Sequence, residues 1–148
     1  MTKCRIDFYL SLDPDPKAQM LIACRLLEKA YLRGHRVFVL CDSLAFAENL
    51  DELLWTFKEL SFIPHHLQGE GPEPPPPIQI GTEKPHGFRD ILLNLCATIP
   101  PFFSQFRRIM EIIAADEPAI EIGRDHYREY RANGCELHTH EIESALAP

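Results

Sequence analysis

The segment SFIPHHLQGEGPEPPPP, residues 61–77, concentrates residue types that often do chemistry: two adjacent histidines, two glycines and two acidic residues. Adjacent residues of a strand point to opposite faces, so His65 and His66 could not both reach one metal ion. The stretch GEGPE at residues 69–73 carries two carboxylates and a proline without an N–H group. A phosphate needs backbone donors and no opposing charge. The segment therefore predicts neither a metal site nor a phosphate loop.

A second group of potential metal ligands lies near the end of the chain, at Cys135, His138 and His140. In an extended segment His138 and His140 share one face. A structural zinc site usually takes four ligands from paired clusters, and a second cluster is absent from the sequence. We therefore interpret these residues as polar groups of an edge strand, and we predict no metal and no cofactor.

Nucleotide and nucleophile motifs are also missing. The turn SLDPDPK, residues 11–17, follows the first expected strand with no glycine, two prolines and two aspartates, where a phosphate loop would need backbone donors. No G-x-S-x-G motif occurs, and a Cys–His pair is neither supported nor excluded. Turn formation and capping explain Asp13, Asp15 and Asp42 near the strand ends. We predict no catalytic residue, with a degenerate nucleotide-binding enzyme as an alternative.

The stretch GRDHYREYRANG, residues 123–134, carries the more specific signal. Arg124, Arg128 and Arg131 follow helical spacing and would share one helix face with Tyr127. Ion pairs from Asp125 to Arg128 and from Glu121 to Arg124 would make this an ordinary solvated face. Arginine and tyrosine are, however, enriched at binding hot spots, and here they cluster on an acidic protein. We interpret the face as a binding surface; a direct contact to single-stranded DNA is an alternative.

Trp55 and Phe62 raise a similar question. They belong to the run LLWTFKELSFIP, residues 53–64, which places large apolar groups at an expected junction between a helix and a strand. Such groups are either core residues or exposed anchors for a partner protein. Composition alone leaves both interpretations open.

Composition excludes several classes of protein. The 148 residues fit one ordinary domain, residues 1–148, and carry a net charge of −7, which disfavours duplex binding. Five scattered cysteines without C-x-x-C spacing are typical of reduced thiols in a cytosol. No segment approaches the about 18 apolar residues of a membrane helix. We therefore expect a soluble cytoplasmic protein with no membrane contact.

Hydrophobic periodicity predicts an α/β protein. We expect helices over residues 16–33, 42–55, 100–113 and 117–133, the second capped by Asp42 or Ser43. We expect strands over residues 4–12, 36–41, 61–63, 78–80, 90–96 and 136–142, the last at an edge. Alternation of strands and helices predicts an open, mostly parallel sheet with helices on both faces.

Four motifs occur along the chain in this order: LDELLW (residues 50–55), SFIPHHLQGEGP (61–72), DILLNL (90–95) and YREYRANG (127–134). Together they closely resemble the chi subunit of bacterial DNA polymerase III, over essentially the whole chain. The resemblance implies a Rossmann-like domain without a phosphate-binding loop. It implies an accessory role without an active site, in which nucleic acid is contacted only indirectly.

The resemblance also implies partners. One is the psi subunit, which tethers chi to the clamp loader and would contact Trp55 and Phe62; a repair helicase would use the same side. The other is the acidic, phenylalanine-ended tail of single-stranded DNA-binding protein. That tail would bind the last helix and the end of the preceding helix, at Arg124, Tyr127, Arg128 and Arg131 with Ile113 as an apolar wall.

Two features depart from the family pattern. Ile120 and Glu121 stand one turn before Arg124, where another basic group would strengthen the basic surface, and the run Pro74–Pro77 is longer than expected. The sequence therefore predicts the centre of the basic surface and leaves its extent open.

Overall fold

The computed structural model describes residues 4–15, 17–58, 62–71 and 74–142. They form one sheet of seven strands in the order β3-β4-β2-β5-β6-β1-β7, and every strand pairing is parallel. The strands are β1 (Arg5–Ser11), β2 (Val37–Leu40), β3 (His65–Leu67), β4 (Ile78–Gly81), β5 (Ile91–Asn94), β6 (Arg108–Ile113) and β7 (Glu136–Ile142). The helices are α1 (Ala18–Leu32), α2 (Leu44–Thr56) and α3 (Glu117–Ala132), with one 3₁₀ turn, η1 (Phe103–Gln105).

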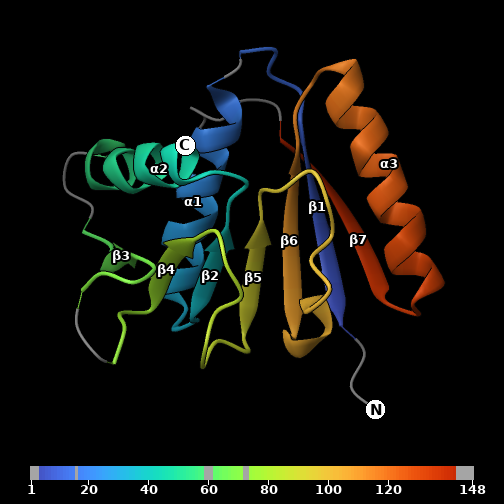
Figure 1. Cartoon of the computed structure of the whole chain (residues 1–148). Helices are drawn as coiled ribbons and strands as arrows, with labels where there is room; N and C mark the ends of the chain where they lie inside the picture. The colour runs from blue at the N-terminus through green and yellow to red at the C-terminus, as the bar shows by residue number, and fades with distance from the viewer. Residues whose placement is uncertain (1–3, 16, 59–61, 72–73, 143–148) are drawn as a thin grey trace.

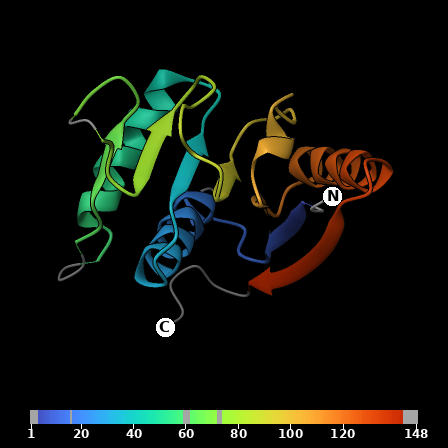
Figure 2. The same cartoon turned by 90° about the horizontal axis from the view of Figure 1, so that it is seen from below.

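The helices lie on both faces of this sheet, which confirms the predicted α/β architecture. Figures 1 and 2 show α1 and α3 on opposite sides of the strands. In β2, Val37 and Val39 pack with α1 and α2, while Phe38 and Leu40 face the other way. That second face is covered by α3 over β6, β1 and β7. Over β2 and β5 it is covered by aromatic side chains from the loops, among them Phe88 and Phe106.

Local signals explain where the helices begin and end. Ser43 caps α2 by accepting a hydrogen bond from the Phe46 N–H, and Asp116 caps α3 by accepting one from the Ala119 N–H. Helix α3 ends at Ala132 with Asn133 as its C-cap, within one residue of the predicted end. The expected start of α1 at Pro16 lies outside the described residues. No helix in the described part of the chain combines the length and apolar character that crossing a membrane requires.

The prediction of a helix over residues 100–113 is wrong. The chain makes only the short turn η1 and then forms β6, a buried strand between β5 and β1. A short apolar run buried on both faces looks the same in sequence whether it is a strand or a helix segment. Ile113 therefore ends a strand and not a helix.

The predicted strand over residues 61–63 is also wrong. Ser61 lies outside the described residues, Phe62 is 67% exposed, and the strand begins only at His65. The other predicted strands are confirmed, including the edge position of β7, which pairs with β1.

A polar network is centred on the buried carboxylate of Asp7. It lies on the same face of the sheet as α1, over the strands that this helix does not cover. The carboxylate accepts hydrogen bonds from Arg5 (3.0 Å), Arg108 (2.7 Å) and His140 (2.8 Å). Burial alone raises the pKa of Asp7, but these donors outweigh burial and lower it to about 2. The network joins β1 to its two neighbours, β6 and β7.

This network yields a stability prediction. Replacing Asp7→Asn should lower the free energy of unfolding at neutral pH by about 1–3 kcal/mol, because three partly exposed donors lose the charged acceptor that is buried between them. Since the folded-state pKa is depressed, the contribution is present above the unfolded value near 3.8 and is lost as pH falls through about 2. Urea unfolding of both proteins between pH 2 and 7 measures the difference.

The exposed Glu52→Gln serves as the control with the same change of charge, and it should leave stability nearly unchanged. A difference between Asp7→Asn and the unmodified chain that stayed constant down to pH 2 would contradict the role assigned to this carboxylate.

Candidate binding surfaces

A cavity of about 380 Å³ opens between α3 and the carboxyl ends of β1, β6 and β7. Its walls are mostly apolar, with one arginine and one tyrosine among them. The lining residues are Phe8, Leu10, Ser11, Leu12, Ile113, Ala114, Ala115, Ile120, Gly123, Arg124, Tyr127 and Thr139. A volume of this size is within the range of small-ligand sites and accommodates an aromatic side chain.

Three of the predicted site residues meet at this cavity: Ile113 from the end of β6, and Arg124 and Tyr127 from α3. Tyr127 is 39% exposed, and its ring centroid lies 5.7 Å from that of Phe8. Gly123 allows α3 to approach β6 closely, because a Cβ built there would lie 2.5 Å from Ile113 Cδ1.

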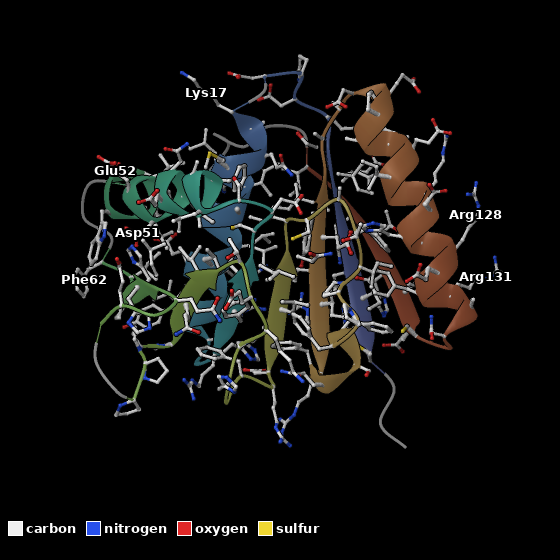
Figure 3. The ribbon with its side chains drawn as sticks, in the orientation of Figure 1. Lys17, Asp51, Glu52, Phe62, Arg128 and Arg131 are labelled. Carbon is white, nitrogen blue, oxygen red and sulfur yellow. The ribbon has the colours of Figure 1, made fainter. Side chains whose placement is uncertain are left out.

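The other two predicted arginines, Arg128 and Arg131, are not among the cavity's lining residues. They project from the exposed side of α3 (Figure 3), and Arg128 forms the predicted ion pair with Asp125 at 2.8 Å. Both partners are largely exposed, so this pair contributes little to stability. Among the described residues, no carboxylate lies within ion-pairing distance of Arg124 or Arg131, and the predicted pair of Arg124 with Glu121 is not formed.

Ile120 has a clear place in this arrangement. It lines the cavity next to Arg124, so the position enlarges the apolar wall instead of extending the basic surface. The cavity therefore has an apolar interior with the unpaired guanidinium of Arg124 beside it, and two further arginines follow along the helix. Such a site suits a ligand with an apolar group adjacent to negative charge.

A buried polar network holds α3 against the sheet beside this cavity. The Glu111 carboxylate of β6 accepts hydrogen bonds from the hydroxyl of Tyr130 (2.5 Å), from Nδ1 of His126 (2.6 Å) and from Nδ2 of Asn94 (3.2 Å). The Nε2 of His126 lies 2.9 Å from the carbonyl oxygen of Ala97. Both ring nitrogens of His126 thus face acceptors, which favours the doubly protonated imidazolium.

The pKa of His126 reflects this environment. Burial alone lowers it, but the hydrogen bond and the charge of Glu111 outweigh burial and raise it above the ordinary value of 6.5. The buried ion pair links β6 to α3, and Asn94 and Ala97 add the end of β5. The network therefore sets the position of the helix that carries Arg124 and Tyr127.

A second exposed surface contains Trp55 and Phe62, which are 46% and 67% exposed. Their ring centroids lie 5.5 Å apart. The Trp55 ring also packs at 4.2 Å against His65, whose side chain is buried. His65 Nε2 lies 3.1 Å from the Asp51 carbonyl oxygen, and its Nδ1 lies 2.6 Å from that of Ile63. His65 is thus a structural group that joins α2, through Asp51, to the segment before β3, through Ile63.

The remaining candidates from the sequence do not converge. His138 pairs with Glu136, and His140 binds Asp7 and stacks on Tyr9. In the described ranges, no three His, Cys, Asp or Glu side chains are arranged to hold a metal ion.

The three aspartates at the strand ends satisfy backbone N–H groups. Asp13 accepts from the Asp15 N–H, Asp15 from that of Lys17, and Asp42 from that of Ala97. Asp13 and Asp15 thus have the predicted turn role, whereas Asp42 joins the loop after β5 and leaves the capping of α2 to Ser43.

Sequence reasoning missed three parts of the site. Leu10, Leu12 and Thr139 reach the cavity only because β1 and β7 pair beside α3, and no local pattern indicates this. Glu111 and its partners did leave a signal, since RIMEII, residues 108–113, places one charge inside an apolar run. Gly123 left one too, because a glycine inside a helix usually has a packing reason.

The parallel α/β sheet, the glycine-free first turn and the cavity beside α3 define a Rossmann-like domain with the features of a binding module. The model of the family described as DNA polymerase III chi subunit, HolC, matches residues 1–138. The DNA polymerase III subunit chi of Pseudomonas aeruginosa is 40% identical over 139 residues, which cover 93% of this chain and 96% of the relative. That of Escherichia coli is 32% identical over 139 residues, covering 89% and 94%. The chain belongs to the DNA polymerase III chi subunit family.

The network of Glu111 yields a pH prediction. Because the pKa of His126 is raised on folding, its stabilisation is fully present below about 6.5 and is lost as pH rises through the folded-state pKa. The difference in free energy of unfolding between the unmodified chain and His126→Gln should therefore shrink from pH 5.5 to 9. Urea unfolding of both proteins measures it, and other titrating groups cancel in the difference. A difference that grew with pH would contradict the assignment.

Proposed function

We propose that this chain is a non-catalytic adaptor of the DNA polymerase III holoenzyme in DNA replication. One surface binds the acidic, phenylalanine-ended tail of single-stranded DNA-binding protein, and the other binds the psi subunit, which connects it to the clamp loader. The observation that carries the proposal is the apolar cavity with Arg124 beside it, whose guanidinium pairs with no carboxylate of the described residues. Membership of the chi subunit family supports the same role.

The chemistry of the cavity fits a terminal phenylalanine. The ring would lie between Ile113, Ile120 and Tyr127, and Arg124 would pair with the terminal carboxylate. Arg128 and Arg131 lie further along α3, where acidic residues preceding the phenylalanine would pass. The cavity and the three arginines would thus all contact the last few residues of the acidic tail.

The expected affinity is moderate. Burying a phenylalanine side chain contributes about 1.5–3 kcal/mol. Each exposed arginine–carboxylate pair adds about 0–1 kcal/mol, and more where the pair is bidentate. After the costs of association, a binding free energy of about −8 kcal/mol is expected, which corresponds to micromolar affinity. The charged part of it is screened by salt.

The test is a titration of the full chain with a labelled acidic peptide that ends in phenylalanine, at low and at high salt. Arg124→Ala should weaken binding about tenfold or more, because the terminal carboxylate loses its partner beside an apolar cavity. Lys17→Ala is the matched control: it removes one positive charge at the start of α1, on the face opposite to α3 (Figures 1 and 3).

Binding of the control should equal that of the unmodified chain, and removal of the terminal phenylalanine from the peptide should abolish binding. Equal affinities for Arg124→Ala and the unmodified chain would reject the proposed tail site. Tight binding of an oligonucleotide without any binding of the peptide would reject the adaptor itself.

The psi subunit is assigned to Trp55 and Phe62, and a repair helicase is the alternative occupant of the same surface. Two adjacent exposed aromatic rings are typical of an anchor that becomes buried on association. The buried His65 ring packs against the Trp55 ring and so supports one of the two proposed anchors.

Phe62→Ala should therefore weaken psi binding at least tenfold while changing the free energy of unfolding by less than about 0.5 kcal/mol, because the side chain is 67% exposed. The control is Leu32→Ala, which removes an even more exposed apolar side chain, 74% exposed, from the end of α1. Titration calorimetry with purified psi measures the affinity of both variants. Equal losses from the two variants would show that the effect is not specific to this surface.

A further inference from the structure

The amino-terminal edge of the sheet, which Figure 2 views from below, carries a feature that the proposed function does not use. Four arginines lie where four neighbouring strands begin: Arg36 before β2, Arg89 before β5, Arg107 before β6 and Arg5 at the start of β1. These strands are adjacent in the sheet in the same order. We call this set the amino-edge arginine row.

Backbone hydrogen bonds establish that the four residues are neighbours. The Ile91 N–H donates to the carbonyl oxygen of Arg36 at 3.1 Å. The Arg107 N–H donates to the carbonyl oxygen of Arg89 at 3.0 Å, and the Arg5 N–H donates to the carbonyl oxygen of Arg107 at 3.0 Å. Since neighbouring strands lie about 4.8 Å apart, the row spans about 14 Å. The spacing of the four backbone positions is built into the sheet.

The charge of the row is largely uncompensated. All four arginines are exposed. Within the described ranges, no carboxylate forms an ion pair with Arg36, Arg89 or Arg107, and only Arg5 has one, with Asp7.

The carboxylates near the row are few. Asp90 is occupied by His35 Nδ1 at 2.9 Å and by the backbone N–H of Arg36 at 3.0 Å. Glu136 lies at the end of the row beside Arg5, and its side chain faces His138. On a chain of net charge −7, this edge is therefore a local concentration of positive charge.

We propose that the amino-edge arginine row binds the phosphodiester backbone of single-stranded nucleic acid. Guanidinium groups bind phosphate oxygens in a bidentate manner, and arginines at the starts of four neighbouring strands can meet a chain of regularly spaced charges, with Arg5 already engaged by Asp7. Within the described residues, the only cation–π contact of the row is that of Arg36 over Phe88, at 4.5 Å, and this ring is buried. Because that ring is not open to base stacking, the contact is independent of sequence.

The chemistry favours a nucleic acid strand over the other polyanions. An acidic peptide would need an apolar anchor, and none of the four arginines lines either of the two cavities described beside α3. A duplex would bring its second strand against the acidic remainder of the protein. The expectation of purely indirect contact with nucleic acid came from the family resemblance. The net charge of −7 disfavoured only duplex binding, and it averages over surfaces that the fold keeps apart.

The experiment titrates the full chain against a labelled oligo-dT and a labelled oligo-rU of about 20 nucleotides each, between about 50 and 200 mM salt. The unmodified chain should bind with a logarithmic salt slope of about −3, since each single-strand phosphate contact contributes about −0.7. Arg89→Ala with Arg107→Ala should weaken binding about tenfold and halve the slope. Arg89→Lys with Arg107→Lys, which keeps the charge, should restore most of the affinity.

The matched control is Arg128→Ala with Arg131→Ala, which removes the same charge from α3 (Figure 3). This control should bind the acidic peptide more weakly and bind the oligonucleotides as the unmodified chain does. The variant Arg89→Ala with Arg107→Ala should bind the oligonucleotides more weakly and bind the peptide as the unmodified chain does. Failure of the tail site and failure of the row are thus distinguishable. The oligo-dT and oligo-rU arms tell DNA from RNA as the source of the phosphates.

Three results would overturn the proposal. The first is absence of oligonucleotide binding at the lowest salt. The second is equal loss of oligonucleotide binding in the two double arginine-to-alanine variants. The third is displacement of the oligonucleotide by polyglutamate at the same charge concentration, which would assign the row to an acidic protein partner.

Discussion

The arrangement of this protein depends on one buried carboxylate. Glu111 lies on β6, between β5 and β1, with almost no exposure to solvent, and an unpaired charge there would cost several kcal/mol. Three donors from two other elements satisfy it: Tyr130 and His126 from α3 and Asn94 from β5. Because hydrophobic packing alone lets a helix slide over a sheet, this directional contact determines where α3 lies.

The position of α3 in turn creates the cavity. Gly123 brings the helix against Ile113, and one turn away the helix separates from the ends of β1 and β7. Arg124 and Tyr127 lie at this opening because His126 and Tyr130 point inward from the same helix. The polar network and the binding surface therefore use opposite sides of α3, so a shift of this helix would change both.

Much of this was predictable from the sequence. The β-branched run at residues 37–40 and the capped helices around it fix an open parallel sheet, and the missing glycines exclude a phosphate loop. The grouping of Arg124, Tyr127 and Arg128 on one helix followed from their spacing. The segment of residues 100–113 was not predictable, because its apolar residues satisfy helical and strand periodicity equally until neighbouring strands accept it. The start of β3 was misplaced for a related reason, since Phe62 is apolar and yet points to solvent.

Sequence by itself determined the local properties of this protein: its elements, its caps, the basic face of α3 and its place in the chi subunit family. These depend on neighbouring residues, whose geometry the backbone dictates within a turn or a strand. Tertiary structure alone decided which distant residues meet. It brought Leu12 and Thr139 to the cavity, joined Asp7 to Arg108 and His140, and set four arginines from separate segments side by side at one edge. The physical reason is that strand order is set by packing and pairing across the whole chain, and no local pattern contains it.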